Sequence, residues 1–204
     1  SMVTTCRRMP FGVDEAGKGP VLGSMFAAAV ACDPTALPEG IGDSKGITPD
    51  RRETLAAEIR AVASVGVAEI SVDRIDDPTT DMNALTVAAH AEALAEVAGD
   101  DATGTVDAGD VNADRFCRRV EAAVADACGA SIAVDARHGA DETDPLVGAA
   151  SIVAKVERDA HVERIADRHA DEYDTVGSGY PSDPTTRAFL ASYVAENGAL
   201  PPCA

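Results

Sequence analysis

The sequence predicts an α/β fold in which a mixed sheet carries helices on both faces. Two observations lead to this fold class. Short apolar runs of strand length alternate with longer segments of helical periodicity, and the first two strand-like runs follow each other without a helix between them. The 204 residues contain no internal repeat, linker or break in composition, so one domain accounts for residues 1–204. Residues 1–10 are an N-terminal extension, in which Ser1 ahead of Met2 is expected to remain from cloning.

Turn and cap residues divide the chain into five expected strands and five expected helices. The strands occupy residues 11–13, 21–31, 65–72, 104–106 and 131–134, and the helices occupy residues 49–62, 82–97, 112–127, 145–168 and 184–197. Thr48 and Asp183 stand in cap positions, each followed by a proline at the start of a helix. Asp110 is expected to cap the helix that begins at residue 112, and Gly198 stands where the last helix stops.

The charge balance is strongly acidic, since 35 Asp and Glu face 17 Lys and Arg and give a net charge of −18. Such a balance ordinarily argues against nucleic acid and anionic lipid as partners, because both attract basic residues. A lysine-poor, Asp- and Ala-rich composition is also typical of a salt-saturated cytosol, where the Debye length falls to ~3 Å or less. In a halophile, net charge would therefore not exclude a nucleic-acid substrate.

Nothing in the sequence indicates secretion or a membrane. The five cysteines are odd in number, scattered and without a CxxC pair, which favours a reducing compartment over disulfides or zinc. The apolar run at residues 21–31 is too short to cross a bilayer. We therefore expect a cytoplasmic protein.

Acidic residues follow the ends of the expected strands. Asp14 and Glu15 come directly after residues 11–13, Asp107 ends the strand at residues 104–106, and Asp141 follows the next strand after a short loop. Functional groups gather at the carboxyl ends of strands in such sheets. Converging carboxylates could hold Mg²⁺ or Mn²⁺, and two such cations can hydrolyse a phosphodiester. Most acids in this chain are expected to solvate its surface. The residues alone therefore do not decide whether these four bind a metal or solvate the surface.

Six segments, in order along residues 11–202, resemble motifs of the type 2 ribonuclease H (ribonuclease HII) family, and the third is closest to archaeal members. They are FGVDEAGKGPVLG (11–23), DSK (43–45), DAGDV (107–111), HGAD (138–141), AASIVAKVERD (149–159) and GSGYPSDP (177–184). The resemblance implies a ribonuclease H-like fold with a mixed five-stranded sheet flanked by helices. It also implies a small helical C-terminal part at about residues 175–204.

The resemblance implies an endoribonuclease that hydrolyses the RNA strand of RNA–DNA hybrids. It further implies nicking of duplex DNA on the 5′ side of an embedded ribonucleotide, which leaves a 3′-hydroxyl and a 5′-phosphate. Matched by motif, the catalytic ligands of Mg²⁺ or Mn²⁺ are Asp14, Glu15, Asp107 and Asp141. The substrate-binding positions are Gly17, Lys18, Gly19, Lys45, Tyr180, Lys155 and Arg158. A glycine turn lets the backbone approach a 2′-hydroxyl closely, and a phenol packs well on a sugar.

Several roles stay open. Lys155 and Arg158 lie one helical turn apart and could contact phosphate or pair with surface acids. His138 could support the metal site or product release without being a ligand. The alternatives to this ribonuclease are another divalent-metal phosphodiesterase on the same fold and a non-enzymatic acidic interaction module. We expect a monomer without a membrane partner, and the sliding-clamp motif that ends many archaeal relatives is not seen in this chain.

Overall fold

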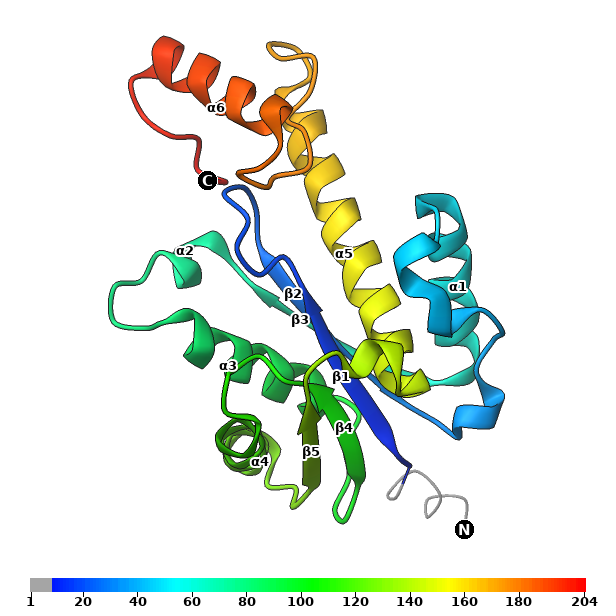
Figure 1. Ribbon diagram of the computed structural model, residues 1–204. Helices are drawn as coiled ribbons and strands as arrows, with labels where there is room; N and C mark the ends of the chain where they lie inside the picture. Colours follow the sequence, from blue (N-terminus) through cyan, green and yellow to red (C-terminus); the bar gives the residue numbers. More distant parts are fainter. Residues whose placement is uncertain (1–8) are drawn as a thin grey trace.

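The computed structural model describes residues 9–204, apart from the side chains of residues 43–45. Its centre is a five-stranded sheet with the strand order β3-β2-β1-β4-β5 (Figure 1). The strands are β1 (Phe11–Ala16), β2 (Met25–Ala31), β3 (Ser64–Ile70), β4 (Thr103–Asp107) and β5 (Ala133–Arg137). β1 pairs antiparallel with β2 and parallel with β4; β3 continues the antiparallel side and β5 the parallel side. The mixed sheet confirms the predicted fold class.

Helices cover both faces of this sheet (Figure 1). They are α1 (Pro49–Val62), α2 (Val72–Ile75), α3 (Met82–Ala95), α4 (Ala113–Cys128), α5 (Pro145–His169) and α6 (Pro184–Asn197). The 3-10 turns are η1 (Pro34–Ala36), η2 (Ile41–Gly46) and η3 (Ala140–Glu142). α5 and α1 pack on one face, and α3 and α4 pack on the other. In the described part of the chain, no helix is long and apolar enough to cross a membrane.

Of the three predicted N-terminal helix caps, two are confirmed and one is wrong. The side chain of Thr48 accepts from the backbone of the first turn of α1, and that of Asp183 does the same at α6. At α4 the cap is Asn112, whose side chain accepts from the backbone N–H of Arg115 at 2.9 Å. Asp110 instead pairs with the guanidinium of Arg115, and it is 3% exposed.

β2 begins later than predicted, at Met25 rather than at residue 21. The preceding residues are drawn away from the sheet by the C-terminal part of the chain, because Val21 N–H donates to Gly179 O and Gly23 N–H donates to Cys203 O. Gly23 also has a φ of +81°, which an extended strand does not allow. The apolar run therefore divides into a turn and a strand.

β5 lies a few residues beyond the predicted range of 131–134. Its position is determined by pairing with β4, in which Thr103 lies opposite Ala133 and Asp107 opposite Arg137. Since Asp135 and Arg137 are exposed and charged, apolar periodicity could not locate this end of the strand.

The start of α5 packs unusually close to β1. A Cβ atom at Gly12 would lie 2.2 Å from the backbone of Leu146 and Val147, so only glycine fits there. This contact places the start of α5 directly against β1, the central strand of the sheet.

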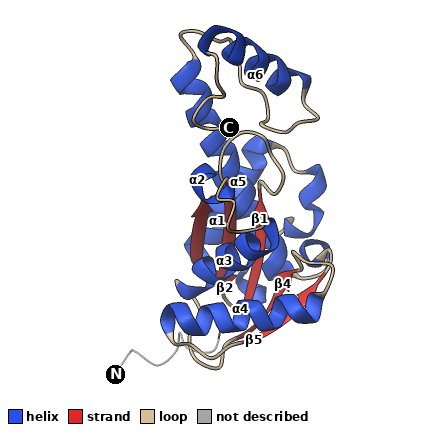
Figure 2. Ribbon diagram, turned by 90° about the vertical axis from the view of Figure 1, so that its left-hand side faces the viewer, coloured by secondary structure: helices blue, strands red, loops and turns tan. Residues whose placement is uncertain are grey.

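The segment after α5 forms a small apolar cluster of its own. Leu22, Ile165, Val176 and Phe189 are buried in it, and it joins α6 to the second half of α5. Figures 1 and 2 show α6 past the edge of the sheet, beyond the carboxyl end of β1. The C-terminal part therefore lies at the same end of the molecule as the acids that follow β1 and β4.

Candidate active site at the ends of β1 and β4

Asp14 and Asp107 are neighbours at the carboxyl ends of the two central parallel strands. Val13 of β1 pairs with Val106 of β4, and an aspartate follows each of these valines. Asp14 is only 7% exposed. The sheet thus brings together two of the four predicted acids.

Asp14 and Glu15 point to opposite faces of the sheet, as successive residues of a strand do. Val13 and Val106 pack in the core under α3 and α4, so Asp14 and Asp107 lie on the α5 side. Glu15 lies on the α3 side. The end of β1 therefore presents one carboxylate to each helical layer.

Asp141 reaches the same place through the loop after β5. The backbone N–H of Ala140 donates to Asp107 Oδ1 at 2.8 Å, and that of Ala108 donates to Arg137 O at 2.9 Å. The first bond docks η3 on the end of β4, and the second joins the ends of β4 and β5. Asp141 comes close enough for its charge to act on the carboxyl of Asp107.

The acids interact strongly with one another. Burial, and after it the negative charges of Glu15 and Asp107, raises the pKa of Asp14 well above its ordinary value. Burial also raises the pKa of Asp107, and the charges of Glu15 and Asp141 add to this effect. Burial alone would raise the pKa of Glu15, but the hydrogen bond and charge of His90 outweigh it, and the pKa of Glu15 is lowered. Such mutual repulsion is the electrostatic condition that a divalent cation relieves.

Each carboxylate oxygen of Glu15 faces a different partner. Oε2 lies 2.6 Å from Nε2 of His90, and Oε1 lies 4.0 Å from Nζ of Lys18. Lys18 Nζ also donates to Gly109 O at 2.6 Å. The glycine turn after β1 is thereby tied to the loop that follows β4.

A second lysine lies on the other side of the acids. Lys155 Nζ donates to Ser151 Oγ at 2.8 Å, and the fully buried side chain of Ser151 is in turn hydrogen-bonded to Asp14. Lys18 and Lys155 are the two lysines whose side chains the structure describes. Both of them lie beside these carboxylates, in a chain with a net charge of −18.

The turn that follows β1 has two glycines with different surroundings. Gly17 and Gly19 have φ values of +90° and +91°, a region that other residues rarely adopt. A Cβ at Gly17 would lie 3.0 Å from the side chain of Arg158, whereas a Cβ at Gly19 would have no neighbour within 4 Å. Gly17 therefore packs inward and Gly19 faces open space.

Arg158 links this turn to Tyr180. Its guanidinium donates to Leu22 O at 2.7 Å, and its Cζ lies 5.8 Å from the centroid of the half-buried Tyr180 ring. Arg158 is 3% exposed, and burial lowers the pKa of its guanidinium. This internal position does not fit the predicted alternative of a surface ion pair. A contact of Arg158 with phosphate stays a prediction.

The four acids fit a hard divalent cation by their chemistry, because they are oxygen donors that repel one another and come from three separate segments. Their side chains do not close around one point as they stand. Within residues 9–204, no three His, Cys, Asp or Glu side chains are arranged to enclose an ion.

The profile of the Ribonuclease HII family matches residues 11–204. The chain belongs to the ribonuclease HII family. It is 66% identical over 197 residues to Ribonuclease HII of Haloarcula marismortui, a match that covers 96% of this chain and 90% of the relative.

Solved structures of the family have the same fold. Ribonuclease HII of Archaeoglobus fulgidus, solved as a complex with PCNA, is 38% identical with a TM-score of 0.84, over 96% of this chain and 92% of that one. Ribonuclease H2 of Pyrococcus horikoshii is 32% identical with a TM-score of 0.83, over 95% of this chain and 90% of that one. The predicted ribonuclease H-like architecture is confirmed.

Membership in the ribonuclease HII family makes the chain an endoribonuclease that acts on RNA–DNA hybrids with a divalent metal ion. This excludes the alternative of a non-enzymatic acidic module. The relatives from halophilic archaea also support the interpretation of the acidic surface as an adaptation to salt.

Two contacts of the site were not predicted from the sequence, namely those of His90 and Ser151. His90 stands among apolar residues of α3 at helical spacing, which indicates a buried polar group that needs a partner. Ser151 lies four residues before Lys155, one helical turn away. Either pattern could have marked a candidate, but neither identifies the carboxylate that the side chain meets.

The structure does not test the roles predicted for Lys45 and His138. The side chain of Lys45 lies outside the described residues, although η2 contains its backbone. His138 is exposed directly after β5, three residues before Asp141. The roles proposed for both stay predictions.

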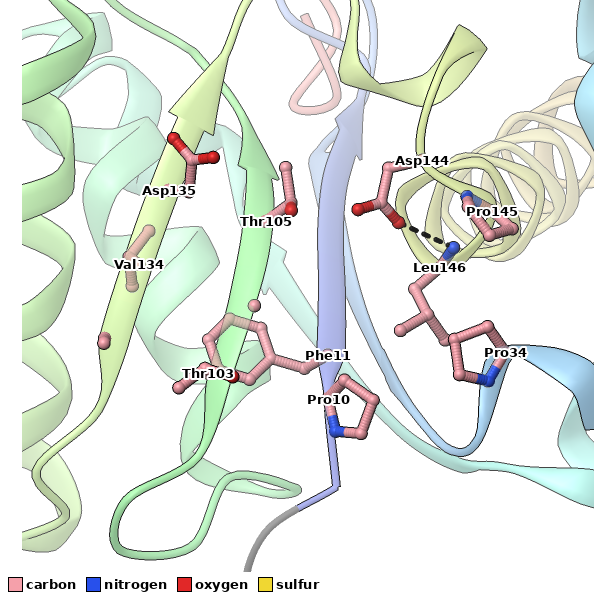
Figure 3. Close-up of a pocket in the computed structure, with 12 residues that line it drawn as sticks. Pro10, Phe11, Pro34, Thr103, Thr105, Val134, Asp135, Asp144, Pro145 and Leu146 are labelled. Atoms are coloured by element: carbon pink, nitrogen blue, oxygen red, sulfur yellow. Dashed lines mark hydrogen bonds between the residues drawn. The ribbon is translucent and has the colours of Figure 1, made fainter.

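A pocket of about 480 Å³ opens near the beginnings of β1, β4 and β5, away from the predicted acids (Figure 3). Figure 3 shows Thr105, Asp135 and Asp144 among its polar side chains. The carboxylate of Asp144 caps α5 by accepting from Leu146 N–H at 2.9 Å. The pocket contains none of the four predicted carboxylates. The candidate site therefore lies outside it, at the carboxyl ends of β1 and β4.

Arg158→Met is expected to lower the free energy of unfolding by about 1–3 kcal/mol, because Leu22 O would lose its buried donor. Urea unfolding at fixed KCl concentration measures this change. Arg164→Met is the matched control, since Arg164 is exposed on the same helix. Equal stability of the two variants would contradict the internal role of Arg158.

Proposed function

We propose that this endoribonuclease nicks duplex DNA on the 5′ side of an embedded ribonucleotide, in addition to cleaving the RNA strand of hybrids. The products would be a 3′-hydroxyl and a 5′-phosphate. The observation that carries the proposal is that Asp14, Glu15 and Asp107 lie at the carboxyl ends of β1 and β4, near Asp141 and the turn of residues 17–19, where their charges act on one another. One chain supplies all four carboxylates, so we expect a monomer to be active, and we expect it to act in the cytoplasm.

The four carboxylates would hold two divalent cations, Mg²⁺ or Mn²⁺. When bound, these ions supply the activation of water and the neutralisation of phosphate charge that in-line hydrolysis needs. Ser151 orients the carboxylate of Asp14, and the bond from Ala140 N–H orients that of Asp107. Lys18 and Lys155 supply the positive charge that draws a phosphate backbone to this end of an acidic molecule. Lys45 would contact a further phosphate.

Recognition of the 2′-hydroxyl would come from the turn and from Tyr180. The backbone at Gly19 is open to a ligand, because nothing lies within 4 Å of the position of a Cβ. The ring of Tyr180 is held near the turn by Arg158, and Val21 N–H donates to Gly179 O at 2.9 Å. A rigid turn next to a fixed phenol can contact one sugar from two sides.

Three duplexes of one sequence test the proposal: an RNA–DNA hybrid, a DNA duplex with a single ribonucleotide, and an all-DNA duplex. Each is incubated with Mn²⁺ or Mg²⁺ in molar KCl. We expect cleavage of the hybrid, one nick on the 5′ side of the single ribonucleotide and no cleavage of all-DNA. Equal cleavage of the all-DNA duplex would favour the general phosphodiesterase instead.

Gly19→Ala is expected to reduce nicking at a single ribonucleotide about tenfold or more, since a misplaced sugar costs much of the rate. Gly129→Ala is the matched control, because Gly129 also has a positive φ, +75°, and open space around it, but ends α4 far from the acids. Both variants carry a similar backbone strain of about 1–2 kcal/mol. A similar loss of nicking in both would show that strain, not the site, is responsible.

A further inference from the structure

His90 is an unusual residue in the core between α3 and β1. It is fully buried, and its ring meets that of Phe116 of α4 edge-on, with centroids 5.2 Å apart. Its one polar contact among the described residues is with Glu15, whose Oε2 lies 2.6 Å from Nε2. A carboxylate can only accept, so the Nε2 atom carries the hydrogen.

The other ring nitrogen of His90, Nδ1, is buried and makes no hydrogen bond in the part of the chain that the structure describes. An unpaired buried polar atom is unfavourable, and an apolar ring of similar size would avoid that penalty. The stability of the core therefore gives no reason for a histidine here, whereas the contact with Glu15 does.

The two oxygens of Glu15 are thereby made unequal. Oε2 is held against α3 by His90, and Oε1 is turned toward Lys18, 4.0 Å away, at the end of the sheet where Asp14 and Asp107 lie. Rotation of the carboxylate would break the bond to His90. Glu15 is therefore held with one oxygen directed outward.

We propose that His90 is a positioning residue, which fixes the carboxylate of Glu15 so that Oε1 is available to a divalent cation. His90 is not itself a ligand, because Glu15 occupies its Nε2 and its Nδ1 faces the core. This inference rests on the proposed metal site, and it extends that site by one residue on α3. Residues that orient ligands in this way typically contribute 10–100-fold to metal affinity.

Binding of Mn²⁺ in the absence of nucleic acid tests the inference, measured by the electron paramagnetic resonance signal of the free ion. His90→Phe keeps the ring but removes the donor, whereas His90→Gln keeps an N–H near the position of Nε2. We expect Mn²⁺ to bind about 10–100-fold more weakly to His90→Phe. His90→Gln should recover most of the affinity. His169→Phe, in the aromatic cluster with Tyr173 and Phe189, is the control and should bind as the unaltered chain does.

The outcomes separate this inference from the proposed metal site. If Asp14→Asn does not weaken Mn²⁺ binding, the metal site itself is wrong. If Asp14→Asn weakens binding but His90→Phe does not, only the role of His90 is wrong. Equal losses in folded His90→Phe and His90→Gln would assign the effect to packing and also overturn the inference.

The unaltered protein provides a test that needs no variant to fold. Proton–nitrogen correlation spectra of its imidazoles should show His90 with hydrogen on Nε2. Loss of this signal in His90→Gln assigns it. A ring with hydrogen on Nδ1 alone would leave Glu15 without its donor and overturn the inference.

Discussion

Asp14→Asn is expected to abolish cleavage while making the protein more stable. The amide removes a charged oxygen from the cation site, so the rate should fall at least about a thousandfold, or about 4 kcal/mol in transition-state stabilisation. The remaining side-chain oxygen can still accept the N–H of Glu15, which now lies 2.8 Å from Asp14 Oδ1. The substitution therefore removes a charge without removing the hydrogen-bond acceptor.

The gain in stability follows from the raised pKa of Asp14, which burial and the charges of Glu15 and Asp107 cause. An acid with a raised pKa in the folded state contributes its stability below the unfolded pKa and loses it as pH rises through the folded pKa. The variant and the unaltered chain should thus have similar Tm values near about pH 4. At pH 7 the variant should melt higher, by about 2–4 °C for each 1 kcal/mol gained.

Thermal unfolding between pH 4 and pH 8 in molar KCl measures this difference. Asp126→Asn is the control, because Asp126 is an exposed acid of α4. The Tm of this variant should equal that of the unaltered chain. Mn²⁺ should raise the Tm of the unaltered chain, since it binds the folded state. The difference in Tm between Asp14→Asn and the unaltered chain should therefore become smaller. A lower Tm for Asp14→Asn at pH 7 would contradict the repulsion, and full activity would contradict the role of Asp14 as a ligand.

The proximity of Asp14 and Asp107 could be predicted from the sequence because it depends on local order. Asp14 and Asp107 end short apolar runs, and parallel neighbours in one sheet bring such ends together. The contact between His90 and Glu15 could not be predicted in this way. It joins residues 75 positions apart, and it depends on which face of α3 packs against β1.

Arg158 shows a second limit of sequence reasoning. Its spacing from Lys155 predicts a shared helix face, and both residues do lie on α5. The two side chains nevertheless differ in role, because the C-terminal part of the chain covers Arg158 and leaves Lys155 at the acids. Arg158 is buried because it contacts Leu22 and Tyr180, and these tertiary contacts cannot be inferred from helical spacing. The division of the chain into one domain with a small C-terminal part stays a prediction.

The stability of the fold is expected to depend steeply on salt. If every Lys and Arg were paired, 18 acids would still lack a basic partner. Surface pairs such as Arg52–Asp159 and Arg74–Glu92 contribute only about 0–1 kcal/mol each, so they cannot offset this repulsion. The Debye length falls from about 30 Å at 0.01 M salt to about 3 Å at 1 M. Over this range we expect the Tm to rise by about 10 °C or more, or roughly 3 kcal/mol.

The cause of this rise can be separated from a general effect of solutes on folding. KCl screens charge, whereas the zwitterion betaine is excluded from protein surfaces without screening. Thermal unfolding in the two solutes at matched osmolality should show a much larger rise of Tm in KCl. An equal rise in betaine would assign the salt dependence to solute exclusion. The acidic surface would then have no part in it, and the net charge of −18 would bear only on solubility.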